Sequence, residues 1–390
     1  MKIRGLSARS LSIWRGWVAA PALMAVLVFG FASVAQAFET IARAAMVVDQ
    51  KTGTVLLSKN ADQPVPPASM SKLMTLNMLF EALQDGRINL DTPFTVSKKA
   101  SAKGGSKMFL REGERVSVEN LIRGIIVHSG NDACIVVAEN LAGSEADFAR
   151  IMTARARKLG LKESTFANAT GWPDPNQRMS ARDLVMLAER LMVQFPEFYG
   201  YFQEKTFTWA NITQDNRNPL LKLGLGADGL KTGHTQEAGY GLVGTARQGD
   251  RRVILMITGL NSSGERASEA ERLMNWAFRQ FTEETLVPAG KTVAQAEVWL
   301  GKKNTVGLAV ADEVVALVPY LNRDEIKAEV RYAGPIEAPI AKGDELGTLT
   351  ITIPDLKEQT FAVFATEDVE AAGLLQRMGV SAQKLVEMVR

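Results

Sequence analysis

Residues 67–75 read Pro67-Ala68-Ser69-Met70-Ser71-Lys72-Leu73-Met74-Thr75, and from Ser69 to Gln84 the chain contains neither Gly nor Pro. The segment is rich in Leu and Met, which predicts a largely buried helix that ends at Asp85-Gly86. Ser69 and Lys72 lie three positions apart, so they share one helical face about one turn apart. A lysine whose pKa is lowered by burial can remove the proton of a serine. If Ser69 begins the helix, its backbone N–H is also suited to bind a developing oxyanion.

Ser-x-x-Lys alone is a weak signal, and two further motifs are equally ambiguous one by one. Ser129-Gly130-Asn131 supplies a hydroxyl and an amide, and Lys231-Thr232-Gly233 supplies a cation and a hydroxyl. Similar spacings recur elsewhere, at residues 381–384, 58–60 and 51–53. The set that begins at Ser69 is distinguished by its order through a length of chain that suits an enzyme. The order, and not any single motif, predicts a serine nucleophile with a lysine base.

Short strands and helices are predicted around these motifs. A hairpin is expected over 44–57, several helices in the middle of the chain, two strands after them and a last helix from Glu265 to Phe281. Strands at both ends with helices inserted between them predict an α+β fold with a mostly antiparallel sheet. The predicted middle helices are 120–127, 133–142, 146–159 and 181–193, and the two later strands are 241–246 and 252–258.

The remainder of the chain predicts a second domain. Leu286 to Lys291 contains Pro288 and Gly290 and is interpreted as a linker. Short alternating stretches follow at the spacing expected of a small β-sandwich, at 293–299, 305–310, 313–318, 326–330, 346–353 and 360–365. The tail from Asp368 to Arg390 returns to helical character. The predicted boundaries are therefore 38–285 for a catalytic domain, 286–367 for a β-rich domain and 368–390 for a C-terminal helix.

The N-terminus has the pattern of a secretory signal. Four basic residues without an acidic one precede or adjoin an apolar run, Trp17 to Phe31, which is followed by Val34-Ala35-Gln36-Ala37. This pattern predicts export and cleavage after Ala37, and a retained membrane anchor is the alternative. Beyond residue 37 the chain has 41 basic and 43 acidic residues, a balance that does not favour a nucleic-acid partner.

Few residues could support other chemistry. Cys134 is the only cysteine and His128 and His234 are the only histidines, so an intramolecular disulfide is excluded and a Cys/His zinc site is disfavoured. His128 is expected to pack or hydrogen-bond beside the cleft, and Cys134 to be buried and inert. The Gly-x-Gly-x-x-Gly pattern at 224–229 lacks the following helix of a dinucleotide site, since a strand is predicted there.

The residues around the motifs resemble those of the low-molecular-mass D-alanyl-D-alanine carboxypeptidases, a group of penicillin-binding proteins. Residues 67–75, 129–133, 105–110 and 228–235 carry the resemblance, which runs from about Ala42 to Phe281. Residues 338–343 resemble the β-rich C-terminal domain of the same family. The resemblance implies a β-lactamase/transpeptidase-like catalytic domain, an antiparallel sheet with a helical subdomain, followed by a small β-sandwich.

The resemblance also implies a reaction and residue roles. Ser69 would attack the carbonyl between the last two D-alanines of a peptidoglycan stem peptide, and Lys72 would take its proton. Ser129 would relay a proton to the leaving amine beside Lys231, and Asn131 would hold the substrate amide. The backbone of Ser69 and of His234, which follows Gly233, would bind the oxyanion. Thr232 and Arg266 would bind the terminal carboxylate. No cofactor or metal is implied, and β-lactams would act as inhibitors.

Several alternatives remain open at this point. A serine β-lactamase shares the motifs, but the Glu-x-x-Leu-Asn context of its deacylating carboxylate is not found in this sequence. A D,D-endopeptidase or transpeptidase would use the same acyl-enzyme, and a non-catalytic cell-wall protein would keep the motifs only as vestiges. The family implies a periplasmic enzyme whose C-terminal helix lies on the membrane surface. Here that helix would lack aromatic residues, so a helix packed on its own domain is the alternative.

Overall fold

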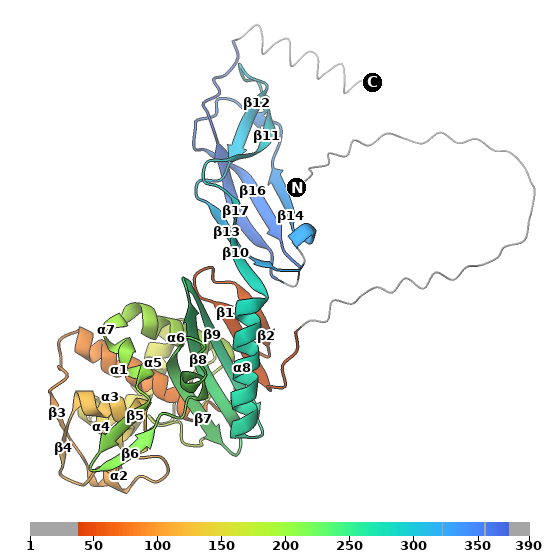
Figure 1. Cartoon of the computed structure of the whole chain (residues 1–390). Coiled ribbons are helices and arrows are strands. Elements are labelled where there is room, and N and C mark those ends of the chain that lie inside the picture. The colour runs from red at the N-terminus through yellow and green to blue at the C-terminus, as the bar shows by residue number, and fades with distance from the viewer. Residues whose placement is uncertain (1–37, 322, 355, 374–390) are drawn as a thin grey trace, which may run out of the picture. The chain divides into compact units, whose positions relative to one another are not determined.

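The computed structural model describes residues 38–321, 323–354 and 356–373 (Figure 1). The predicted signal sequence, residues 1–37, and the predicted C-terminal helix beyond residue 373 lie outside the described residues. No helix within the described ranges is both long and apolar enough to cross a membrane.

A five-stranded antiparallel sheet forms the centre of the first region, in the order β2-β1-β9-β8-β7. The N-terminal hairpin therefore pairs with a strand from the far end of the region, with Val47 opposite Leu255. The sheet confirms the predicted α+β architecture. Its strands are β1 (Ala44–Asp49), β2 (Val55–Lys59), β7 (Ala227–Thr235), β8 (Gly239–Gln248) and β9 (Arg251–Leu260).

The sheet lies between α8 (Ser263–Arg279) on one side and the inserted helices on the other (Figure 1). Serine side chains cap the N-termini of several of these helices, and each accepts a hydrogen bond from the third backbone N–H of its helix. The inserted helices are α1 (Lys72–Gln84), α2 (Lys98–Ala102), α3 (Val118–Ile126), α4 (Asn131–Ala142), α5 (Glu145–Lys158), α6 (Ala181–Gln194) and α7 (Pro196–Tyr199). Small hairpins, β3 (Pro93–Thr95) with β4 (Arg115–Ser117) and β5 (Thr206–Trp209) with β6 (Ile212–Asp215), lie among them.

The start of the first predicted helix differs from expectation. Residues Ala68–Ser71 form a 3-10 turn, and the α-helix begins only at Lys72. Ala68 has φ +48°, a left-handed conformation that interrupts helical geometry just before Ser69. Ser69 therefore lies in a tight turn, whereas Lys72 lies in the first turn of α1, a helix whose apolar residues are mostly buried.

The C-terminal region is a β-structure of its own, as predicted. A six-stranded sheet has the order β14-β16-β17-β12-β11-β15, and β10 pairs with β13 in a second sheet. The strands are β10 (Phe281–Val287), β11 (Thr292–Trp299), β12 (Thr305–Ala309), β13 (Val314–Pro319), β14 (Lys327–Tyr332), β15 (Ile336–Glu337), β16 (Glu345–Thr352) and β17 (Gln359–Ala365).

Three predicted boundaries need correction. Helix α8 ends at Arg279, and Phe281 begins β10 instead of ending that helix. Strand β10 continues to Val287, so the predicted linker at 286–291 and the boundary at 285/286 fall partly inside a strand. The predicted helix from Asp368 does not include residues 368–373, because Val369 bridges Ile340 and Ala371 bridges Gly301. Pairing with these neighbours keeps the chain extended there.

Candidate active site

Ser69 and Lys72 meet at the junction of the 3-10 turn and α1. Lys72 is fully buried, and its Nζ lies 2.8 Å from Ser69 Oγ, 2.8 Å from Asn131 Oδ1 and 2.5 Å from the carbonyl oxygen of Thr170. Burial lowers the pKa of Lys72 to about 8, and the nearby cationic Arg217 and Lys103 act in the same direction. The amine can therefore be neutral near physiological pH while remaining in contact with the serine hydroxyl.

The second motif lies at the turn between α3 and α4. Ser129 has φ +56° and is nearly buried, so its position is set by a left-handed turn. Asn131 begins α4, and its Nδ2 donates to the carbonyl of Gly104 at 2.9 Å while its Oδ1 accepts from Lys72. The structure thus places Asn131 between the lysine and the segment 103–107, which we call the rim.

Asp132, which the sequence did not single out, anchors the residues that directly follow the rim. The carboxylate is fully buried and accepts hydrogen bonds from the backbone N–H of Met108 at 2.9 Å and of Leu110 at 3.2 Å. It also accepts from the N–H of Ala133 at 2.9 Å. A buried carboxylate needs such donors, and its neighbour Asn131 is held in register with the rim as a result.

The third motif lies on β7, the edge strand of the sheet. Lys231 and Thr232 are buried, and burial together with the charge of Lys72 lowers the pKa of Lys231 well below its usual value. Position 233 has no space for a side chain, which explains why it is a glycine. A Cβ there would lie 2.9 Å from the carbonyl oxygen of Pro67, so β7 closely approaches the turn at Ala68–Ser71, which we call the nucleophile turn after the predicted role of Ser69.

His234 and Arg266 share an aromatic neighbour. The exposed His234 imidazole stacks on Tyr240, with ring centroids 3.9 Å apart, and the Arg266 guanidinium lies 5.7 Å from the same Tyr240 ring. Arg266 is only 9% exposed, and its Nη2 lies 3.5 Å from the carbonyl oxygen of Arg217. The structure therefore gathers these residues beside the C-terminal half of β7.

Arg217 is a further cation that sequence reasoning missed. Its Nη1 donates to Ser106 Oγ at 2.5 Å, and its charge contributes to the lowered pKa values of Lys72, Lys231 and Arg266. The residue lies in a polar loop without a motif, so only the tertiary structure identifies it. The site consequently concentrates positive charge, which suits an anionic substrate group.

A loop over residues 168–172 supplies the third acceptor for Lys72. Asn168 Oδ1 accepts hydrogen bonds from the backbone N–H groups of Thr170, Gly171 and Trp172 at 2.9–3.1 Å, which fixes the loop. Gly171 has φ +78°, and a Cβ there would come 1.8 Å from the carbonyl oxygen of Ala68. The loop is thus packed directly on the nucleophile turn. The pattern Asn168-Ala169-Thr170-Gly171 is the sequence signal that could have indicated it.

The other candidate residues lie as expected. His128 packs on Phe207, and its Nε2 lies 2.8 Å from that residue's carbonyl oxygen. Cys134 is fully buried, and burial raises its pKa to about 12, so the thiol is inert. Within 38–321, 323–354 and 356–373, no group of three or more His, Cys, Asp or Glu side chains is arranged to hold a metal ion. Strand β7 begins at Ala227, within the glycine pattern 224–229, in agreement with the predicted strand.

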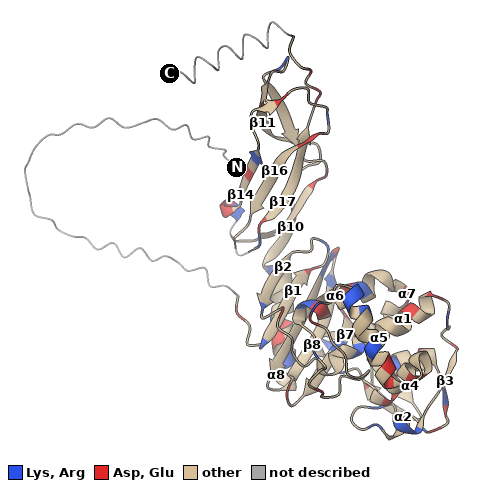
Figure 2. Cartoon of the chain, turned by 180° about the vertical axis from the view of Figure 1, so that it is seen from behind, with Lys and Arg blue, Asp and Glu red and all other residues tan. Residues whose placement is uncertain are grey.

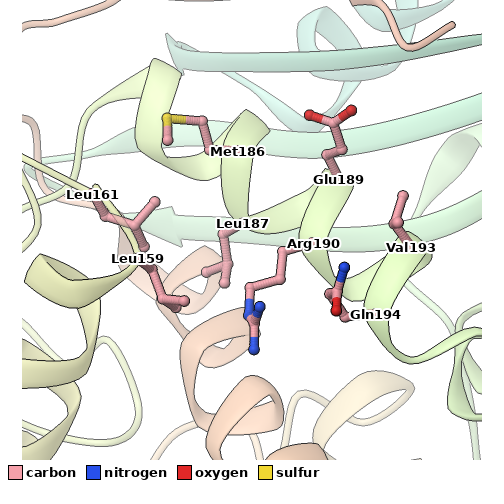
Figure 3. A pocket seen from close by; sticks show the side chains of 8 residues that line it. All are labelled: Leu159, Leu161, Met186, Leu187, Glu189, Arg190, Val193 and Gln194. Carbon is pink, nitrogen blue, oxygen red and sulfur yellow. The ribbon is translucent and has the colours of Figure 1, made fainter.

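A separate groove lies on the outer surface of the helical region (Figure 3). It contains none of the predicted site residues. Its Arg190 donates to Asn77 Oδ1 and to Glu81 Oε1, both at 2.8 Å, so that side chain has a structural role. The groove is lined by Leu159, Leu161, Met186, Leu187, Glu189, Arg190, Val193 and Gln194.

An antiparallel sheet beside a helical region, with a serine and a buried lysine at their junction, defines the class of active-site-serine hydrolases. A family model described as D-alanyl-D-alanine carboxypeptidase matches residues 31–262, and one described as penicillin-binding protein 5, C-terminal domain, matches residues 281–371. The chain belongs to the D-alanyl-D-alanine carboxypeptidase family, peptidase family S11.

Named relatives agree with this assignment. The chain is 36% identical over 384 residues to the D-alanyl-D-alanine carboxypeptidase DacC of Escherichia coli K12, covering 96% of this chain and 94% of the relative. The crystal structure of the D-alanyl-D-alanine carboxypeptidase DacD from Francisella tularensis matches with a TM-score of 0.77 at 29% identity, over 86% of this chain and 95% of that one. Penicillin-binding protein D2 from Listeria monocytogenes, solved with ampicillin bound, matches with a TM-score of 0.56 at 32% identity, over 61% and 98%.

Proposed function

We propose that this enzyme is a serine D,D-carboxypeptidase that removes the terminal D-alanine from peptidoglycan pentapeptide stems through an acyl-enzyme on Ser69. One observation carries the proposal. Lys72 Nζ lies 2.8 Å from Ser69 Oγ in a fully buried position where its pKa is lowered to about 8. This is the geometry and the protonation that a general base requires.

Acylation begins when neutral Lys72 takes the proton of Ser69, whose Oγ attacks the carbonyl carbon between the two D-alanines. The backbone N–H groups of Ser69 and His234 stabilise the oxyanion of the tetrahedral intermediate. Asn131 has its Oδ1 on Lys72, so the side chain that orients the base also borders the bound substrate amide.

Collapse of the intermediate breaks the peptide bond and releases D-alanine. Ser129 delivers the proton to the leaving amine, and Lys231 favours this transfer through its positive charge. Thr232 and Arg266 bind the terminal carboxylate of the substrate, and Arg217, whose carbonyl lies 3.5 Å from Arg266, adds positive charge at the same end. Water then hydrolyses the ester on Ser69 and regenerates the enzyme.

The surroundings of Lys72 support a peptidase over a β-lactamase. A β-lactamase needs a carboxylate to activate the deacylating water, but among the described residues no carboxylate hydrogen-bonds to Ser69 or Lys72. The carbonyl of Thr170 occupies the third position around Lys72 Nζ. A β-lactam should therefore acylate Ser69 and leave slowly, in keeping with the ampicillin-bound relative.

Two assays test this function. Wild-type protein should release D-alanine from a pentapeptide, and Ser69→Ala should not. Equal background release from both proteins would refute the catalytic assignment. A labelled penicillin should remain bound to the wild-type enzyme for many minutes. Rapid turnover of the label would instead identify a β-lactamase.

We also propose that the chain is exported to the periplasm after cleavage behind Ala37 and that the segment after Gly373 contacts the membrane surface. The basic and apolar N-terminus and the family assignment support export. N-terminal sequencing of the mature protein should begin at Phe38. Comparing the membrane-bound fractions of the full chain and of a chain ending at Gly373 tests the anchor, since equal distribution would exclude it.

A further inference from the structure

A second cationic feature lies at the mouth of the active site. The Lys103 ammonium lies 4.3 Å from the ring centroid of Trp172, whose side chain is 44% exposed. Ion pairs between described side chains include the neighbouring Lys99 but not Lys103. Figure 2 shows further basic residues gathered at α2, directly before this position. A cation without a carboxylate partner, seated on an exposed aromatic face, can accept an anionic group from outside.

Trp172 is fixed in relation to the predicted catalytic groups. Its backbone N–H donates to Asn168 Oδ1 at 3.0 Å, in the same loop whose Thr170 carbonyl contacts Lys72. A Cβ built on Gly105 would lie 3.0 Å from the indole and 2.9 Å from Asn131 Nδ2. The indole therefore packs on the rim beside Asn131, and its exposed face has a defined orientation.

The rim connects two different ends of the site. At one end Ser106 bonds to Arg217, which adjoins Arg266, and this is the end proposed to bind the terminal carboxylate of the substrate. At the other end Lys103 contacts Trp172. A peptide whose leaving D-alanine lies at the Arg217 end should extend its acyl part toward Trp172.

A small pocket adjoins Trp172 on the nucleophile side. Its wall includes Ala68 of the nucleophile turn and Thr235 at the end of β7. Glu237, which also lines it, is paired with Arg178 at 2.9 Å, so its charge is compensated. The pocket therefore borders both the turn that carries Ser69 and the Trp172 indole.

We propose that Lys103 and Trp172 form a donor subsite that binds a side-chain carboxylate on the stem residue immediately before the D-alanyl-D-alanine pair. The Lys103 ammonium pairs with that carboxylate, and the part of the indole that stays exposed packs on the methylene groups of the same side chain. The inference rests on the proposed carboxypeptidase function and specifies the substrate class of that site.

Two synthetic pentapeptides that differ only at the third residue test the subsite. One carries diaminopimelate, which has a side-chain carboxylate, and the other carries lysine, which does not. Lys103→Met should lower kcat/KM for the diaminopimelate peptide by about fivefold through KM, the size expected of a partly exposed ion pair. With both peptides assayed above the pKa of Lys72, where the charge of Lys103 no longer affects the protonation of Lys72, the lysine peptide should change by less than about twofold. Lys103→Arg should retain the preference for the diaminopimelate peptide. Trp172→Ala should raise KM for both peptides.

Lys107→Met is the matched control, since Lys107 lies on the same rim with its ammonium 5.7 Å from the ring centroid of Phe109. It should leave the peptide preference unchanged. Acylation by labelled benzylpenicillin tests whether Lys103 has a purely structural role, because a structural defect would slow acylation as well. Equal losses with both peptides and with penicillin, or no loss with either peptide, would overturn the donor subsite. Absence of D-alanine release by the wild type from both peptides would overturn the proposed function and the subsite with it.

Discussion

Two groups of charged residues in the same region, one partly buried and one fully buried, differ in how their charges are paired. In the helical region, Glu81 accepts from Arg155 at 2.9 Å and from Arg190 at 2.8 Å, so each charge has an opposite partner. In the active site, Lys72 and Lys231 are buried without an ion pair to any described carboxylate. Burial lowers the pKa values of both lysines.

The difference separates what stabilises the fold from what equips the site. Paired charges hold helices α1, α5 and α6 together through one carboxylate, as Arg155 and Arg190 converge on Glu81. Unpaired buried amines cost stability, because the protein excludes water from a group that prefers to be charged. In Lys72 the same burial supplies an amine that can lose its proton near neutral pH.

Replacing Lys72 should have the largest effect on the candidate active site. Lys72→Met should reduce acylation of Ser69 by labelled penicillin by on the order of 10³-fold, the contribution of a general base. Its melting temperature should not fall, because an apolar side chain replaces a buried amine. Lys302→Met, in the C-terminal region, is the control and should acylate normally. Acylation of Lys72→Met at the wild-type rate would remove Lys72 from the mechanism.

Replacing Glu81 tests the paired half. Glu81→Leu leaves two arginines without their carboxylate and should lower the free energy of unfolding by about 2–3 kcal/mol in urea denaturation. The folded variant should still acylate at the wild-type rate. Glu329→Leu removes an exposed pair with Arg331 and should change stability by less than about 1 kcal/mol. Similar small losses in both variants would show that the Glu81 pairs are not stabilising.

The pH dependence of acylation sharpens the contrast. A neutral Lys72 is the active form, so the rate should rise with pH through about 8 and level off above it. Arg217 lowers the pKa of Lys72 by its charge, so Arg217→Gln should move this rise toward higher pH. Stopped-flow acylation by penicillin across pH 6 to 10 measures the midpoint. An unshifted midpoint in the variant would contradict the electrostatic coupling.

Asp132 should have the opposite and smallest effect. Its carboxylate raises the pKa of Lys72, so Asp132→Asn should move the midpoint toward lower pH in the same assay. The amide oxygen can still accept from the backbone N–H of Met108, so the folded site should persist. A shift in the same direction as that of Arg217→Gln would show that changes in the rim, and not charge, control the titration.

The sequence indicated the class of fold and the candidate reacting residues, but not the groups that surround them in the structure. Motif order located Ser69, Lys72, Asn131 and Lys231, which the structure brings around one cleft. Arg217 was missed because a single arginine in a polar loop has no pattern. The Thr170 carbonyl was missed because a backbone acceptor is independent of residue type. The predicted helix start was wrong because the left-handed conformation before Ser69 is adopted by Ala68, and no glycine marks it in the sequence.

The contacts of Gly171 and Gly233 with residues 67–68 have a consequence for how the chain is made. The nucleophile turn is synthesised early, but its walls come from a loop and a strand that emerge much later. Strand β1 likewise waits for β9 before it is paired on both sides. A nascent or truncated chain that ends before β9 therefore already contains the predicted catalytic residues Ser69, Lys72 and Ser129. Its central sheet is nevertheless incomplete. Activity should appear only as a late, all-or-none event of synthesis.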